Sequence, residues 1–419
     1  MFRRSLFHRS RSPSSLTFLD KCEHFVPFRV DVLMDRILAD RRLTEEQASQ
    51  FQELRKMLAS RFHYEYRKIL ESLKREFAVF DPDPDTLDKP EDSDTEFDEK
   101  YVRLNEAVKS LLTRCNYIAM TPDQLDACLE LQPVGGLSVF VDKKDFSTFD
   151  VFFRGVRKDT VEESRFFLFR QKWKTVIFSR VVVLARSNEA NKDRFFIKIF
   201  KDVSVENLKI VVPKVRLGMP VFDRLKISGT VFGSLATTLY KVVFAFMLSW
   251  WLFAVILSSL VVAAFRGVFS FLNSRTKYLH VFSSSLYYLS VSNNEAALTT
   301  LIDTAEEQEL KESLLAYFML FVLRNRQLTI QQLDEAVEHW LLEQFEFDVD
   351  FEVDDAMDKL KKFGLVASQG PIDKVYDLPT VLRRLDEAWD NFFPYYESGG
   401  TTDDRVADGD WPPFPTANK

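Results

Sequence analysis

Aspartate is the residue type whose spacing comes nearest to a site for chemistry. Asp81, Asp83, Asp85 and Asp92 fall at positions 1, 3, 5 and 12 of a calcium-binding loop. The pattern is incomplete because Thr86 stands where a turn glycine is needed, and position 12 is not a glutamate. Prolines also stiffen the loop. A solvated acidic loop is the leading interpretation, and a calcium site is the alternative.

Other patterns that could carry chemistry also have simpler interpretations. The acidic residues of segment 348–355 alternate with apolar ones, which indicates a half-exposed strand leading into an acid-rich helix start. The five histidines are scattered, and Cys22, Cys115 and Cys128 form no Cys-x-x-Cys pair, which argues against zinc and against a disulfide framework. No nucleophile–base arrangement or phosphate loop is visible. We therefore predict no cofactor, no metal and no enzymatic activity.

A long apolar stretch dominates the middle of the chain. Residues 227–272 contain only Lys241 and Arg266 as charged residues, and the 24 residues from Val242 to Phe265 contain none. Because about 20 apolar residues suffice to cross a bilayer, the stretch predicts an integral membrane protein. The compartment is expected to be a bacterial inner membrane, or a mitochondrial membrane if the chain is eukaryotic.

Two helices crossing as a hairpin are favoured over one crossing. A single span would place Trp250 and Trp251 near the bilayer centre, whereas tryptophan prefers the interface. A hairpin of about 227–248 and 252–272 moves both tryptophans to the turn, although Lys241 and Arg266 must then be accommodated within it. Both flanks are basic, which also favours the hairpin. Gly229 and Gly233 form a small-xxx-small step suited to helix packing.

The fold class predicted from these patterns is an α+β multidomain membrane protein. It has a helical N-terminal region, an antiparallel β-rich middle, a transmembrane helical hairpin and a helical, winged-helix-like C-terminal region. The boundaries are a basic tail at 1–20, a helical domain at 21–133, a β-rich domain at 134–226, the membrane segment at 227–272, a helical domain at 273–392 and a disordered tail at 393–419.

Helix ends are marked by local signals. Thr44 with Gln47, Ser292 with Glu295, and Thr329 with Gln332 have the spacing of capping boxes. Pro122 suits the first position of a helix that begins after Thr121. Gly364 suits a left-handed helix end, followed by a hairpin around Gly370-Pro371 and a last helix over 379–392.

Charge is distributed unevenly and limits the expected partners. Residues 143–226 hold 20 basic and 10 acidic residues, and we expect them to contact anionic lipid head groups of the bilayer. Residues 294–419 hold 27 acidic and 11 basic residues, which argues against nucleic acid and suits protein partners.

Four segments, in this order along the chain, resemble the transmembrane protein 143 family, a group without known function that has bacterial and mitochondrial members. They are EHFVPFRVDVLMDRIL, FHYEYRKILESLKREFAVFDPDPDT, FKDVSVENLKIVVPKVRLGMPVFDRLKISGTVFGSLATTLYK and TKYLHVFSSSLYYLSVSNNEAALTTLIDTAEEQELKESLLAYFML. The resemblance covers roughly residues 23–390. It implies a membrane protein, usually drawn with two crossings, and assigns no activity and no catalytic residues.

The function expected from the sequence is that of a membrane-anchored interaction or scaffold protein, with both folded regions on the cytoplasmic or matrix face. The alternative is a lipid- or small-molecule-binding or transport accessory protein, in which Lys241 and Arg266 would serve an anionic group.

Overall fold

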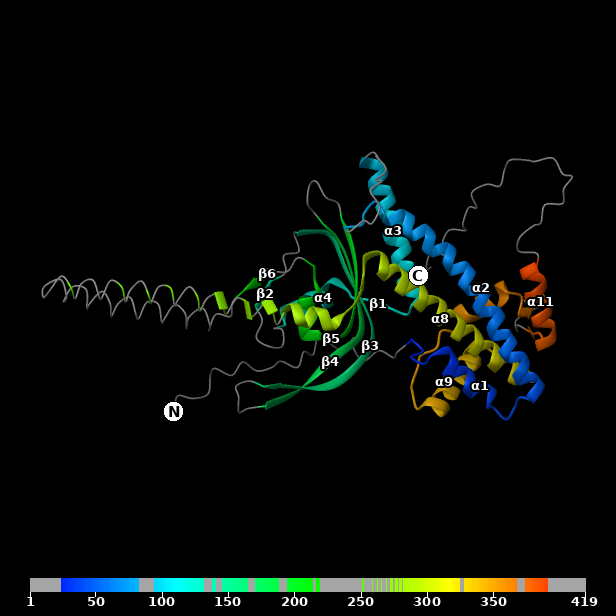
Figure 1. Cartoon of the computed structure of the whole chain (residues 1–419). Helices are drawn as coiled ribbons and strands as arrows, with labels where there is room; N and C mark the ends of the chain where they lie inside the picture. The colour runs from blue at the N-terminus through cyan, green and yellow to red at the C-terminus, as the bar shows by residue number, and fades with distance from the viewer. Residues whose placement is uncertain are drawn as a thin grey trace. The chain divides into compact units, whose positions relative to one another are not determined.

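A computed structural model describes residues 24–82, 94–131, 138–140, 145–164, 170–187, 194–213, 216–218, 282–324, 328–367 and 374–390, with scattered positions between 251 and 280. The chain divides into two compact units (Figure 1). The first consists chiefly of residues 120–151 and 156–291, and the second of residues 17–119, 152–155 and 292–419.

Most strands of a five-stranded antiparallel sheet belong to the first unit. The order is β1–β3–β4–β5–β7, with β1 at Ile118–Ala119, β3 at Phe146–Ser164, β4 at Arg170–Ser187, β5 at Phe195–Ser204 and β7 at Ser290–Asn293. In β4 and β5, Val182 stands opposite Ile199. The run Val181–Ala185 is buried throughout, which explains why its sequence is continuously apolar rather than alternating.

Short elements cover part of this sheet and complete the first unit. They are α4 (Pro122–Glu130), a 3₁₀ turn (Val205–Asn207), α5 (Leu208–Val211), and a small ribbon of β2 (Ser138–Phe140) with β6 (Arg216–Gly218). Phe146, Ala185 and Val212 form a buried cluster against which Leu129 and Phe196 pack. The basic sheet region predicted from sequence is therefore a real β structure with its own core.

The second unit is a bundle around one central helix, α8 (Asn294–Val322). Around it lie α1 (Val30–Leu38), α2 (Glu45–Phe77), α3 (Asp94–Arg114), α9 (Ile330–Phe345) and α10 (Val353–Lys362), while α11 (Leu378–Asp390) packs on α2. The ribbon of β8 (Val366–Ala367) and β9 (Lys374–Val375) lies between α10 and α11 in sequence. Residues 308–319 of α8 are all buried, as expected for a helix enclosed on every side. Helices from both ends of the sequence thus share one core (Figure 1).

Most predicted helix ends are confirmed. The hydroxyl groups of Thr44, Thr121 and Thr329 each accept a hydrogen bond from the backbone N–H of the glutamine three residues on. The side-chain oxygen of that glutamine accepts one from the backbone N–H of the threonine. Pro122 is the first residue of α4, and Gly364 has φ +72° after α10. The predicted box of Ser292 and Glu295 is wrong, because α8 begins one residue later, after Asn293, without a side-chain cap.

The prediction of an integral membrane protein is corrected. Within the described residues, no helix is both long and apolar enough to cross a membrane. The longest ones, α2 and α8, carry charged residues and pack against each other. The transmembrane hairpin and the bacterial inner or mitochondrial membrane location are therefore not supported, and the fold class becomes a mixed α and β protein.

Most of segment 227–272 lies outside the described residues. This holds for Lys241, Arg266, Trp250, Gly229 and Gly233. Trp251 is described as helical and highly exposed, with 79% of its surface accessible.

Candidate functional site

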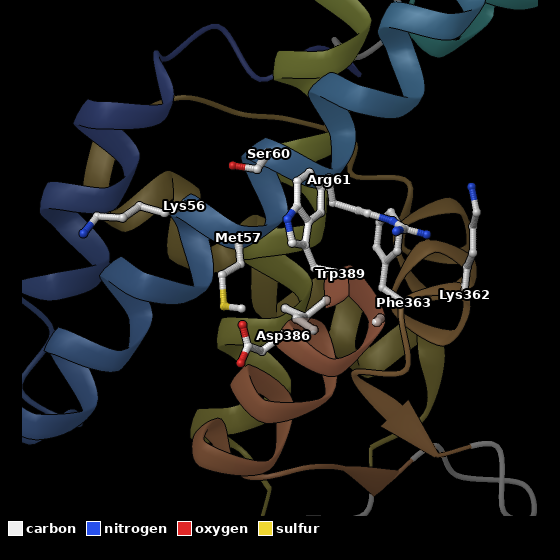
Figure 2. Close-up of a pocket in the computed structure, with 10 residues that line it drawn as sticks. Lys56, Met57, Ser60, Arg61, Lys362, Phe363, Asp386 and Trp389 are labelled. Carbon is white, nitrogen blue, oxygen red and sulfur yellow. The ribbon is translucent and has the colours of Figure 1, made fainter. Parts of the chain in front are cut away.

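A pocket of about 310 Å³ lies in the second unit, where α2, the end of α10 and α11 meet (Figure 2). This volume is at the lower end of the range for small-molecule sites. The lining side chains are Lys56, Met57, Ser60, Arg61, Lys362, Phe363, Leu385, Asp386, Ala388 and Trp389.

Helix α2 supplies one wall of the pocket, next to the apolar stripe that it buries in the bundle core. Leu54, Leu58 and Phe62 recur at four-residue spacing and are fully or almost fully buried in the bundle core. The adjoining positions Met57 and Arg61 are displaced around the helix from that stripe, and they line the pocket. This wall of the pocket therefore lies along the edge of the α2 face that is buried in the bundle core.

The end of α10 supplies the second wall. Phe363 packs edge-on against Phe62, with ring centroids 5.0 Å apart. The Nζ atom of Lys362 donates a hydrogen bond of 2.7 Å to Oε2 of Glu65 on α2. Helix α10 ends at Lys362, and the left-handed conformation of Gly364 two residues later turns the chain away.

Helix α11 supplies the third wall through its C-terminal half. Leu378, Val381 and Leu385 anchor it by burial. Trp389 is 42% exposed, and its ring meets Tyr64 edge-on at a centroid distance of 6.4 Å. Figure 2 shows Trp389, Phe363 and Met57 gathered around the pocket, with Lys56 and Lys362 on opposite sides of it.

The charges around the pocket are unequal in number. Three cationic side chains, Lys56, Arg61 and Lys362, line it beside one carboxylate, Asp386. Arg61 and Lys362 share Glu65, at 3.5 and 2.7 Å. Lys56 is paired with Glu53, but both side chains are more than half exposed, and such pairs bind weakly. The lining therefore combines an apolar interior with three cations and one carboxylate, while Glu65 and Glu53, which do not line the pocket, pair with those cations.

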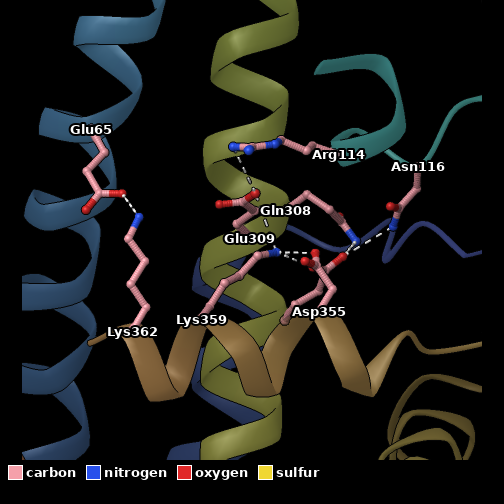
Figure 3. A network of polar contacts seen from close by, with 9 residues as sticks. Glu65, Arg114, Asn116, Gln308, Glu309, Asp355, Lys359 and Lys362 are labelled. Atoms are coloured by element: carbon pink, nitrogen blue, oxygen red, sulfur yellow. Dashed lines mark hydrogen bonds and ion pairs between the residues drawn. The ribbon is translucent and has the colours of Figure 1, made fainter. Parts of the chain in front are cut away.

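A buried polar network fixes α10 against the central helix (Figure 3). Nζ of Lys359 lies 3.1 Å from Glu312, 3.5 Å from Glu309 and 2.6 Å from Asp355. The side chain of Gln308 donates to Glu312 at 2.9 Å. Successive turns of α10 thus reach two partners, since Lys359 binds α8 while Lys362 binds α2.

Burial and charge act against each other in this network. Burial alone would lower the pKa of Lys359, but the carboxylates of Glu312, Glu309 and Asp355 outweigh it and raise the pKa. Burial raises the pKa of Glu312, and Lys359 only partly offsets this. The ammonium group therefore stays charged and holds the network together.

The N-terminal segment before α1 is held by a second set of cations. Nζ of Lys311 donates to the carbonyl oxygens of Val26 at 2.8 Å and Phe28 at 3.2 Å. The guanidinium of Arg154 lies 3.7 Å from the ring centroid of Phe25 and donates to the carbonyl of Cys115 at 2.9 Å. Burial lowers the pKa of Lys311 to about 8. These contacts are structural, because they are internal and satisfied by backbone carbonyls.

An acidic surface lies elsewhere on the second unit, on α9 and the segment leading into α10. Burial and the carboxylates of Glu338, Asp350, Asp354 and Glu335 raise the pKa of Asp334 to about 6. His24 approaches Asp350 at 3.6 Å and Glu352 at 3.8 Å. Segment 348–355 was predicted as a strand leading into an acid-rich helix start. The strand is wrong, because residues 348–352 form no strand. The helix start is confirmed, because α10 begins at Val353 and carries Asp354 and Asp355 in its first turn.

The sequence-predicted calcium residues are only partly within the described residues. Asp81 is 8% exposed rather than solvated, and it lines a polar cavity with Lys74 and Glu295. Asp83, Asp85 and Asp92 lie outside the described residues. Among described residues, no group of three or more His, Cys, Asp or Glu side chains is placed to hold a metal ion.

Sequence reasoning did not identify the pocket. Its residues come from three helices separated by up to 333 positions and form no motif. The one available signal is Trp389, an aromatic residue on the exposed part of an otherwise amphipathic helix.

Residues 178–296 match a family model described as protein of unknown function (DUF3754). The match falls outside the residues that line the pocket. No solved structure matches the chain. The resemblance to the transmembrane protein 143 family stays a prediction.

Proposed function

We propose that this protein is a non-enzymatic binding protein that holds an amphipathic anion in the pocket between α2, α10 and α11. The ligand has an apolar body and an acidic head group. The observation that carries the proposal is the combination of Met57, Phe363 and Trp389 with a surplus of cationic side chains.

The apolar part of the ligand gains from leaving water. Trp389 and Phe363 present aromatic surface, and burial of apolar area contributes roughly 25 cal/mol per Å². The acidic head gains from Lys56, Arg61 and Lys362, because a charge-assisted hydrogen bond is stronger than a neutral one. Ser60 is the hydroxyl group in the lining, which contains no histidine. The lining residues therefore suit binding better than acid–base chemistry.

The probe that tests the proposal is 8-anilinonaphthalene-1-sulfonate, an aromatic anion whose fluorescence rises in apolar sites. We expect saturable binding to the full chain that decanoate displaces better than decanol, because only decanoate carries the acidic head. Ala388→Trp fills the pocket from an exposed position on α11, and we expect it to weaken probe binding at least tenfold.

Glu387→Trp is the matched control, because Glu387 is exposed on the same helix and does not line the pocket. It adds the same indole and should leave binding within about twofold. Equal probe binding in the wild type and in Ala388→Trp, or equal displacement by decanoate and decanol, would rule out the proposed site.

A second candidate function, an interaction or scaffold role, is favoured by the acidic surface around Asp334. The carboxylates of Glu338, Asp350 and Asp354 that act on Asp334 suit a basic peptide. A decalysine peptide should bind the full chain in low salt, and the double variant Asp350→Asn/Asp354→Asn should weaken this binding. Binding that is insensitive to salt or to this variant would exclude the acidic surface.

A further inference from the structure

The chain leaves α11 directly beside the pocket. Helix α11 ends at Asp390, and Ala388 and Trp389 line the pocket. Residues 391–419 lie outside the described residues. Whatever follows Asp390 therefore starts within a few ångströms of the pocket wall, since consecutive Cα atoms are about 3.8 Å apart.

The sequence of this C-terminal segment combines acidic and large apolar side chains, as the ligand proposed for the pocket does. Residues 391–419 contain five acidic and two basic residues. Near the end, Asp410 directly precedes the run Trp411-Pro412-Pro413-Phe414-Pro415, and Asp408 lies two residues before Asp410. Acidic groups and large apolar rings thus lie within eight consecutive residues, and this combination matches the amphipathic anion proposed above.

The prolines favour docking of this run. Each proline fixes its φ near −65°, so less conformational entropy is lost on binding. Proline-rich segments with extended backbones commonly bind grooves lined by aromatic side chains. Trp389 and Phe363 supply such side chains at the pocket.

We propose that residues 408–415 of the chain itself occupy the pocket, with Trp411 and Phe414 against its apolar interior and Asp408 and Asp410 facing its lysines. The inference rests on the proposed function, because it concerns the same pocket. The C-terminal segment is then a built-in competitor, and an external anion binds only by displacing it.

The connection is long enough for this arrangement. Twenty residues separate Asp390 from Trp411, and an extended chain of that length spans up to about 70 Å. A tethered segment acts at an effective concentration on the order of 1 mM. A segment that binds with a dissociation constant of about 0.1 mM would therefore weaken the binding of an external ligand about tenfold.

The experiment compares 8-anilinonaphthalene-1-sulfonate binding in full-length chains. Trp411→Ala/Phe414→Ala removes the docking rings, and Asp408→Asn/Asp410→Asn removes the adjacent charges. Asp403→Asn/Asp404→Asn is the matched control, because it removes equal charge from the same segment away from the aromatic run. We expect about tenfold tighter probe binding in the first variant, an intermediate gain in the second and no gain in the control.

Two further measurements separate the possible outcomes. A synthetic peptide of residues 404–419 should displace the probe from Trp411→Ala/Phe414→Ala, and Ala388→Trp in that background should abolish both probe and peptide binding. Unchanged probe affinity in Trp411→Ala/Phe414→Ala, with Ala388→Trp still blocking the probe, overturns the internal competitor and leaves the proposed function standing. Probe binding that Ala388→Trp does not weaken in either background overturns both the internal competitor and the proposed function.

Discussion

Lys362 and Glu65 are 297 residues apart in sequence, and their side chains meet at 2.7 Å across one wall of the pocket. Glu65 belongs to α2 and Lys362 to α10, so the contact joins two helices that are far apart in the chain. One turn earlier on α10, Lys359 is buried against the central helix. The position of the pocket wall therefore depends on both lysines, but for different physical reasons.

Lys359→Met is expected to destabilise the protein strongly. The substitution leaves Glu312 buried without its cation and leaves Glu309 with Arg114 alone, at 3.8 Å. Breaking a buried pair in this way costs about 3–5 kcal/mol. Urea denaturation should show a lower midpoint. Lys56→Met is the control, because its pair with Glu53 is exposed and should change stability by no more than about 1 kcal/mol. Equal effects would contradict the role given to the buried network.

Asp334→Asn is expected to stabilise the protein at pH 7. The pKa of Asp334 is about 6 in the folded protein, above its ordinary value of 3.8. Between these two pH values the folded state therefore keeps the carboxyl proton, whereas the unfolded chain has lost it. Stability contributed by this group therefore falls as pH rises through that window. The gain should be up to about 1 kcal/mol, because the group is partly exposed.

The pH dependence identifies the cause of that gain. The difference between Asp334→Asn and wild type should vanish at pH 3, where the carboxyl is protonated in both states. A constant difference from pH 3 to pH 7 would assign the effect to packing instead.

Gly364→Ala is expected to cost about 1–2 kcal/mol, owing to the backbone alone. Gly364 has φ +72°, and an added Cβ would meet no atom within 4 Å. Gly364→Asn should cost less, because asparagine tolerates the left-handed conformation. Chemical denaturation of both variants tests this, and a larger loss for asparagine would point to crowding rather than conformation.

The thiols of Cys115 and Cys128 are expected to be unreactive in the folded protein. Burial raises the pKa of both to about 12, so almost no thiolate is present at pH 8. In a Cys22→Ser variant, Ellman's reagent should react negligibly before denaturation and with two thiols afterwards. Fast reaction of either thiol in the folded variant would contradict its burial.

Local features of the fold were predictable because their partners are close in sequence. The capping boxes at Thr44, Thr121 and Thr329 each join groups three residues apart. Gly364 was predictable because its left-handed conformation depends only on its own backbone. The box at Ser292 failed, although its spacing was equally good, because the chain entering α8 places Asn293 at the helix end.

The membrane prediction shows the limit of hydrophobicity as a guide. A run of apolar residues is stabilised when it is removed from water, but the run alone does not determine whether lipid or other parts of a protein surround it. Residues 314–322 of α8 also contain no charged residue, and in the structure the other helices of the bundle surround this helix.

The sequence by itself determined where α2, α4 and α9 begin, that the middle of the chain is rich in strands, and how charge divides between the basic sheet region and the acidic C-terminal part. These properties depend on short-range hydrogen bonds, backbone preferences and periodicity. Only the tertiary structure decided that Lys359 finds its carboxylates on α8 and that Trp389 meets α2. Such contacts join residues far apart in the chain, and their energy depends on burial that no local pattern records.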